Sequence, residues 1–128
     1  MSDVGSVGFY SDTPLGIPVA LGGDWDTIDV GEDPASVKRR LREKLPNSGD
    51  GPEPERPRLH ELIDSLGERQ AHLLYNFLKK SVDMRSGVSV RFQRRDFDQP
   101  GVLRDSIVTM RFNPEKGKDP WYLTVNFA

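Results

Sequence analysis

Apolar and polar residues alternate most clearly in the last third of the chain, where the pattern predicts three antiparallel strands. The apolar positions recur at every second residue: Val88, Val90 and Phe92; Val108, Met110 and Phe112; and Trp121, Leu123, Val125 and Phe127. The two connections, residues 98–101 and 113–118, are rich in Asn, Asp, Pro and Gly, which are typical turn residues. We therefore expect a three-stranded meander with one apolar face that packs on a helix.

Residues 58–82 carry apolar side chains at helical spacing. The stripe consists of Leu59, Leu62, Ile63, Leu66, Leu73, Leu74, Phe77 and Leu78. It keeps helical phase across Gly67, so one continuous helix fits the pattern. A break fits as well, because Gly67 and Gln70 weaken that turn and Ser65 could cap a second helix. The predicted fold counts this region as one long helix.

A shorter helix is predicted to begin at Pro34. Asp33 is a good N-cap residue, and proline is favoured at the first helical position. Apolar residues then recur at every fourth position, namely Val37, Leu41 and Leu45. The proline that follows Leu45 should end this helix, whose opposite face carries five basic side chains.

The rest of the chain is less regular. Residues 7–10 and 17–21 are predicted to form short strands, and residues 24–30 form a weaker candidate because their apolar side chains do not share one face. Residues 46–57 are rich in Pro, Gly and acidic residues, which predicts a flexible linker. We expect one α+β domain over residues 1–128. Residues 1–45 form an acidic β-rich segment with a short basic helix, and residues 58–128 form a long helix and the sheet.

Charge is unevenly distributed, although the formal net charge is only -2. Residues 1–35 carry seven acidic and no basic side chains, whereas residues 36–45 carry five basic side chains and one acidic one. Residues 84–128 carry eight basic and five acidic side chains. The near-neutral total therefore combines an acidic beginning with a mildly basic end.

The composition excludes several classes of protein. The chain has 128 residues and no cysteine, which rules out disulfide scaffolds, Cys-ligated zinc and thiol catalysis. The longest largely apolar run, residues 15–23, is too short to span a bilayer, and the first residues lack the pattern of a signal peptide. We expect a cytoplasmic or otherwise intracellular protein that has no membrane partner.

Catalytic motifs are weak. His60 and Asp64 lie one helical turn apart, but Asp64 stands where a zinc-protease helix needs its second histidine, and the remaining histidine, His72, is predicted on the far side. We favour a solvated His–Asp pair over a metal site. No glycine-rich phosphate loop and no nucleophile elbow occur in the sequence. We therefore expect neither an enzyme nor a cofactor.

Two features suggest a protein partner. A tryptophan flanked by acidic residues near position 25 is a candidate interface anchor, although a core position is an equal alternative. The final strand carries no internal charge to protect an open edge, so it is either covered by residues 7–10 or 17–21, or paired across chains as a homodimer, which we expect. The candidate protein-binding residues are Asp24, Trp25, Asp26, Asp29, Trp121, Leu123, Val125 and Phe127.

A nucleic-acid partner is the alternative. The polar face of the predicted sheet carries arginines and one aromatic side chain, a combination that suits phosphates and stacked bases. The basic helix could follow a phosphate backbone, but neutralising the acidic segment before it is a simpler role. The candidate residues are Lys38, Arg39, Arg40, Arg42, Arg91, Arg94, Arg95, Arg111 and Tyr122.

The sequence thus favours a non-catalytic interaction module, a small accessory or inhibitor subunit that acts through protein contacts. A nucleic-acid-binding accessory protein is the second hypothesis. The motifs identify neither the partner nor the pathway.

Overall fold

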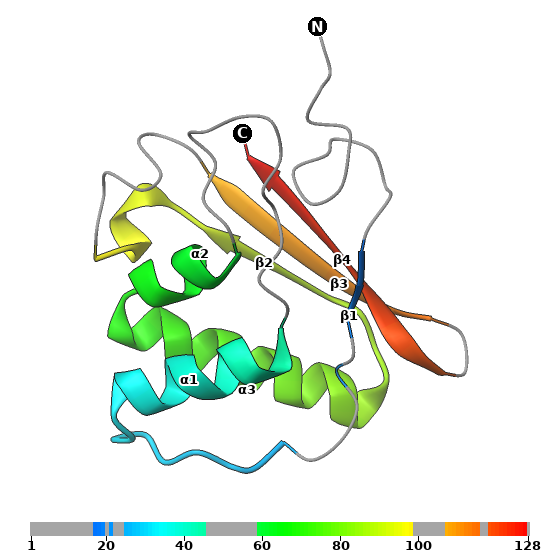
Figure 1. Cartoon of the computed structure of the whole chain (residues 1–128), viewed down its shortest axis with the longest axis horizontal. Helices are drawn as coiled ribbons and strands as arrows, with labels where there is room; N and C mark the ends of the chain where they lie inside the picture. The colour runs from blue at the N-terminus through cyan, green and yellow to red at the C-terminus, as the bar shows by residue number, and fades with distance from the viewer. Residues whose placement is uncertain are drawn as a thin grey trace, which may run out of the picture.

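The computed structural model describes residues 17–19, 21, 25–45, 59–98, 107–115 and 118–127 (Figure 1). Three helices lie on one side of an antiparallel sheet, so the α+β class is confirmed. The helices are α1 (Pro34–Lys44), α2 (Leu59–Ser65) and α3 (Glu68–Met84). The strands are β1 (Ile17–Val19), β2 (Val88–Phe92), β3 (Val108–Glu115) and β4 (Lys118–Phe127), and a short 3₁₀ helix, η3 (Arg94–Asp96), follows β2.

The sheet contains the predicted meander. Its strand order is β1-β4-β3-β2, and all three pairings are antiparallel. Val90 stands opposite Met110, which stands opposite Val125, so the apolar positions of three strands share one face. Each of these three side chains is at most 5% exposed. The period-two pattern therefore identified the buried face because neighbouring strands keep their apolar residues in register.

Helix α1 begins and ends where its sequence predicts. The Asp33 carboxylate accepts a hydrogen bond from the backbone N–H of Ala35 at 3.2 Å, and Pro34 occupies the first turn. Leu45 is the C-cap residue. Val37 and Leu41 are fully buried, and α1 packs across α2 and α3.

The prediction of one long helix is wrong, because the chain breaks between α2 and α3. Leu66 leaves the helix and forms an isolated antiparallel bridge with Phe97. The N–H of Gly67 donates to the Asp96 carbonyl at 2.8 Å, and the N–H of Asp98 donates to the Ser65 carbonyl at 2.7 Å. The backbone groups freed by the break are thus paired with the segment that follows β2.

Glycine at position 67 allows this close approach. A Cβ atom there would lie 2.6 Å from Oε1 of Gln70 and 3.3 Å from the backbone oxygen of Asp96. Gly67 is the N-cap residue of α3, and it makes no side-chain capping bond. The predicted alternative of a second helix was therefore correct, but Ser65 is the last residue of α2 rather than the cap of α3.

The core joins all three helices to the inner face of the sheet. Among the described residues, Trp121 and Tyr75 are the largest side chains that are less than 2% exposed, at 0% and 1%. Six of the eight residues in the predicted helical stripe are buried. Leu73 and Phe77 are exceptions, at 38% and 43% exposed, because each precedes a core residue and lies about 100° around the helix from it.

The N-terminal predictions have mixed outcomes. Of residues 17–21, Ile17–Val19 form a strand, which pairs with β4. The weaker candidate strand over 24–30 is not found: residues 25–29 form no strand. The strand predicted over 7–10 and the whole linker predicted over 46–57 lie outside the described residues. Within the described ranges, none of the helices has the length and apolar character needed to cross a membrane.

Candidate functional site

Trp25 lies in the core, which is one of the two positions that the sequence predicts for it. Its side chain is 7% exposed, and its Nε1 donates to the Leu21 carbonyl at 2.8 Å. Its ring centroid lies 5.1 Å from that of Tyr75, and the ammonium of Lys44 lies 4.9 Å from the ring. The neighbouring Asp24 lies outside the described residues. Burial and aromatic packing therefore account for the tryptophan.

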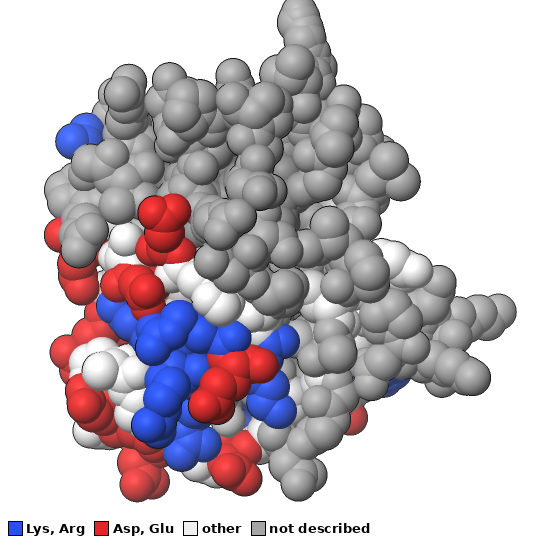
Figure 2. Space-filling model, in the orientation of Figure 1, with Lys and Arg blue, Asp and Glu red and all other residues white. Residues whose placement is uncertain are grey.

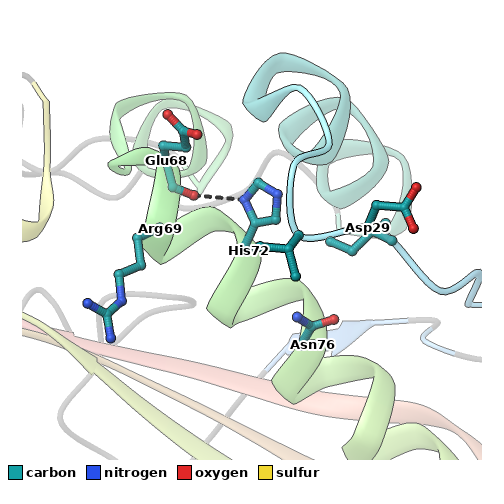
Figure 3. A pocket seen from close by; sticks show the side chains of 7 residues that line it. Asp29, Glu68, Arg69, His72 and Asn76 are labelled. Atoms are coloured by element: carbon teal, nitrogen blue, oxygen red, sulfur yellow. Dashed lines mark hydrogen bonds between the residues drawn. The ribbon is translucent and has the colours of Figure 1, made fainter.

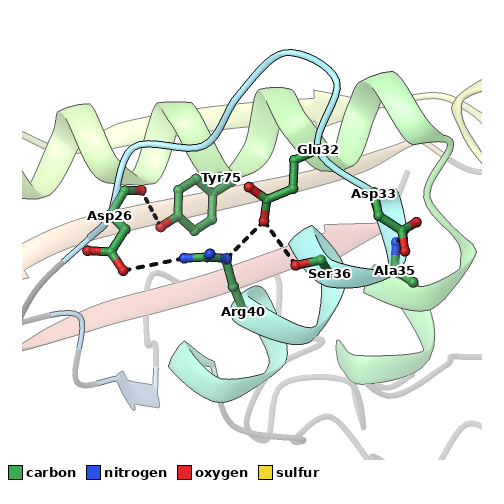
Figure 4. A network of polar contacts seen from close by, with 7 residues as sticks. All are labelled: Asp26, Glu32, Asp33, Ala35, Ser36, Arg40 and Tyr75. Atoms are coloured by element: carbon green, nitrogen blue, oxygen red, sulfur yellow. Dashed lines mark hydrogen bonds and ion pairs between the residues drawn. The ribbon is translucent and has the colours of Figure 1, made fainter.

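The acidic segment is tied to α1 by a polar network centred on Arg40 (Figure 4). The guanidinium lies 3.5 Å from the Asp26 carboxylate and 3.1 Å from the Glu32 carboxylate. Ser36 donates to the same Glu32 oxygen at 2.9 Å, and the Tyr75 hydroxyl donates to the Asp26 backbone oxygen at 2.7 Å. The helix therefore neutralises part of the acidic segment that precedes it.

Two ionisable side chains in this network have shifted pKa values. Burial raises the pKa of the Tyr75 hydroxyl, although the positive charge of Arg40 opposes the shift. Desolvation would lower the pKa of Arg40, but the Glu32 carboxylate and the contact with Tyr75 outweigh it and raise that pKa. Tyr75 stays protonated and Arg40 stays charged near neutral pH, which suits a structural contact.

Other basic residues of α1 also have partners within the chain. Arg42 forms an ion pair with Asp64, and Lys38 donates to the Asp64 backbone oxygen at 2.8 Å. Arg39 is exposed, as are the acidic side chains of Asp29 and Asp26. Figure 2 shows basic side chains over α1 with acidic side chains around them. We call this surface, formed by the basic side chains of α1 and the acidic side chains around them, the α1 flank; it brings opposite charges together.

The histidines do not converge on a metal site. Nε2 of His60 lies 2.7 Å from the Leu45 carbonyl, while its predicted neighbour Asp64 is held by Arg42. Nδ1 of His72 lies 3.0 Å from the Glu68 carbonyl. Among the residues that the structure describes, no group of three or more His, Cys, Asp or Glu side chains could hold a metal ion.

His72 lines a hollow of about 540 Å³ between α3 and residues 28–30 (Figure 3). The charged groups around it diverge: the Arg69 guanidinium and the Asp29 carboxylate both point away from His72. A ligand site needs a few convergent polar groups, so this arrangement provides little for specific recognition.

The final strand is partly covered by β1, which is one of the two arrangements that its sequence predicts. β1 pairs with it over Trp121–Leu123 in the described part of the sheet, with Ile17 opposite Leu123. Trp121, Leu123 and Val125 are 0% exposed, so these side chains pack in the chain's own core and offer no exposed docking surface. The side chain of Phe127 lies outside the described residues. The homodimer stays an untested prediction, but its premise fails at the three positions that β1 covers.

The outer face of the sheet has the predicted polar character. Arg91, Arg111 and Tyr122 are all exposed, and Tyr122 is 36% exposed. Arg111 pairs with Ser89 on one side and Thr124 on the other, so Arg91 and Arg111 belong to neighbouring strands of one face. Arg94 and Arg95 follow in η3, where both are exposed. The structure thus brings four predicted arginines to the β2 end of the sheet and leaves the α1 residues elsewhere.

A groove between α3 and the beginning of β2 was not predicted from the sequence. Phe77 and Met84 are 43% and 64% exposed, and they border a hollow of about 190 Å³. Apolar pairs one position apart, such as Leu73 and Leu74, were the available signal, because such pairs make a stripe too wide for one core face. We call this hollow the α3–β2 groove; it is lined by Phe77, Lys80, Ser81, Met84, Ser86, Gly87 and Val88.

Comparison with known proteins finds no family model, no curated protein and no solved structure that matches this chain. The function therefore has to be inferred from the surfaces of the molecule itself. Of these, the α3–β2 groove combines exposed apolar side chains with the outermost described strand of the sheet.

Proposed function

We propose that the protein is a non-catalytic interaction module, an accessory or inhibitor subunit that binds a partner protein at the α3–β2 groove. The observation that carries the proposal is the exposure of Leu73, Phe77 and Met84 along one flank of α3. Leu73 and Phe77 lie four residues apart, so they share a helix face that the core does not cover. Clustered exposed apolar side chains are typical of interaction sites.

Covering the exposed apolar side chains of α3 would favour binding. Complete burial of a Phe, Met or Leu side chain stabilises a protein or a complex by about 1.5–3 kcal/mol. Because these side chains on α3 are partly exposed in the isolated chain, part of that free energy is not realised there. A partner that covers Phe77 and Met84 would recover it. Aromatic side chains and methionine are also enriched in the cores of protein interfaces.

A catalytic role has weaker support. The two histidines lie against backbone carbonyl oxygens of Leu45 and Glu68, and the charged groups around His72 diverge. General acid–base catalysis needs a titratable group within reach of a substrate in a shared site. We therefore propose no reaction for this protein.

Nucleic-acid binding is the second candidate, and the exposed arginines on the outer face favour it. Arg91 and Arg111 lie on adjacent strands, with Tyr122 on the same face. Under this alternative, binding of an RNA or DNA oligomer should weaken steeply with salt, because each neutralised phosphate releases counterions. Replacing Arg91 and Arg111 with alanine should then reduce both the affinity and the salt dependence.

The test of the main proposal compares partner capture by three forms of the full-length chain. These are the wild type, the double variant Phe77→Glu with Met84→Glu, and the control Val30→Glu. Val30 is 97% exposed in a turn, so its replacement adds a similar charge at an apolar surface position outside the groove. Circular dichroism would verify that all three are folded.

We expect at least one protein from the source cells to be recovered with the wild type and with Val30→Glu. Quantitative mass spectrometry should find its recovery reduced by about tenfold with the double variant, the change produced by about 1.4 kcal/mol of binding free energy. Recovery of the same proteins in equal amounts with all three forms would contradict docking at the groove.

A further inference from the structure

The strand beside the α3–β2 groove lies at the edge of the described sheet. β2 pairs with β3 on one side, and none of the other described strands pairs with it. An edge strand presents backbone N–H and C=O groups that can pair with an additional strand. Val88, the first residue of β2, lines the groove, so the groove adjoins the beginning of this strand.

The two faces of a strand added at this edge would meet different surroundings. On the helix side, its side chains would lie near Phe77, Met84 and the half-buried Val88. On the outer side, they would lie near Ser89 and Arg91, which are both exposed. Since side chains alternate along a strand, an added segment would match this edge by alternating apolar residues with residues that suit a positive charge.

The charges around this edge are mostly positive. Lys80, Arg91 and Arg95 are exposed near β2, and Arg111 lies on the neighbouring strand. Two of the acidic groups close by are engaged within the chain. Asp83 pairs with Lys79 at 3.1 Å, while the Asp96 carboxylate accepts hydrogen bonds from the Gln93 backbone N–H and the Gln70 side chain. An acidic partner would therefore complement this edge.

A second copy of the chain suits the same edge poorly. Two-fold antiparallel pairing of β2 with itself would bring the two copies of Arg91 onto the same face, opposite or diagonal to each other. Like charges in such cross-strand positions destabilise a sheet. A nucleic acid would use the arginines but would leave the apolar side of the groove unmatched.

We infer that β2 accepts an extended acidic segment of a partner protein as an additional strand, with its acidic side chains facing Arg91 and its apolar side chains entering the α3–β2 groove. This inference rests on the proposed function, since it assigns the partner's chemistry to the same site. Backbone hydrogen bonds would supply affinity, and the alternating side chains would supply specificity.

The experiment selects ligands for the full-length chain from a displayed library of random segments of about ten residues, enough to cover a typical strand. We expect enriched sequences to alternate acidic with apolar residues. The inference would be overturned if the enriched sequences placed apolar residues at helical spacing or were basic, or if no sequence were enriched.

The enriched sequence is then synthesised in three forms: unmodified, N-methylated at the odd-numbered residues, and N-methylated at the even-numbered residues. Alternate backbone N–H groups of a strand point in opposite directions, so only one of the two methylated peptides loses the donors that face β2. That peptide should bind about tenfold more weakly than the unmodified one, as measured by fluorescence anisotropy. Equal affinity of all three peptides would exclude strand addition.

Charge reversal tests the outer face. Arg91→Glu should weaken binding of the acidic peptide by about tenfold and should favour a peptide in which lysine replaces each acidic residue. The control Arg39→Glu changes an exposed arginine on α1 and should leave both affinities unchanged. If Arg91→Glu and Arg39→Glu act alike, the complementarity assigned to Arg91 is wrong.

Failure of this inference can be separated from failure of the proposed function. If Phe77→Glu with Met84→Glu abolishes partner capture but no alternating acidic segment is enriched, the groove binds a partner by another mode. Binding of an RNA oligomer that depends on Arg91 and competes with the peptide would instead favour the nucleic-acid alternative. Self-association in sedimentation equilibrium that Arg91→Glu alters would identify a second copy as the occupant.

Discussion

The α1 flank and the α3–β2 groove use charge in opposite ways. On the α1 flank, Arg40 and Arg42 pair with acidic residues that are distant in sequence, and Glu32 also binds Ser36. Around the groove, Lys80 is exposed beside the apolar side chains of Phe77 and Met84, and Arg91 is exposed on the outer face of β2. A dense run of charge in the sequence can thus be satisfied internally, whereas scattered basic residues next to exposed apolar groups define the more promising binding surface.

The largest expected effect separates the two flanks of α3 at adjacent positions. Leu74→Ala should destabilise the protein by about 2–5 kcal/mol, because Leu74 is 0% exposed and its truncation leaves a cavity. Leu73→Ala should cost less than about 1 kcal/mol, because Leu73 is 38% exposed. Urea denaturation of both variants gives the comparison, and equal losses would mean that the groove flank of α3 is covered in solution.

The next effect tests the buried end of the network beside the α1 flank. Tyr75→Phe should cost about 1–2 kcal/mol, because it removes the hydrogen bond to the Asp26 carbonyl and leaves that oxygen unpaired. Thermal unfolding at neutral pH measures this loss. A variant as stable as the wild type would imply that water replaces the tyrosine hydroxyl.

The same residue predicts a pH dependence. Burial raises the pKa of Tyr75 above its ordinary value of 10.0, so the unfolded chain releases this proton at lower pH than the folded chain does. Its contribution to stability is therefore complete below pH 10.0 and is lost as the pH rises through the folded pKa. Stability measured from pH 9 to 11 should fall more steeply for the wild type than for Tyr75→Phe.

The smallest expected effect concerns the ion pairs on α1. Arg40→Ala should lower the stability of the protein only slightly, because Arg40 bridges Asp26 and Glu32 in a partly exposed network. The matched change Arg39→Ala, at an exposed position one residue earlier, should have almost no effect. High salt should reduce the difference between them, and a difference that persists would point to packing of the Arg40 stem instead.

Periodicity predicted the parts of this fold in which side-chain pattern and backbone agree. The alternation at Val90, Met110 and Val125 identified the buried face of the sheet, and the Asp33–Pro34 pair identified the start of α1. The break at Gly67 was left open because it depends on Asp96 and Asp98, which approach from a different part of the chain. Local sequence cannot specify such a long-range pairing.

The candidate site was harder to predict because exposure depends on tertiary packing. Trp25 was considered for the surface, yet Tyr75 and Lys44 enclose it. Phe77 was assigned to the core stripe, yet it borders the groove. The outer-face arginines were correctly identified as exposed, since a polar position between apolar strand positions points away from the core. Cover of the final strand by residues 17–21 was one of two predicted arrangements, and β1 pairs with β4 from within that segment.

The backbone bonds between residues 65–67 and 96–98 have a consequence for local unfolding. They close a loop that contains α3 and β2, so the start of α3 is held by the segment that follows β2. Opening this loop would release the beginning of the helix and the end of the strand together, as one cooperative unit in amide hydrogen exchange. A ligand that holds β2 closed would then slow exchange in the first turn of α3, where it makes no contact.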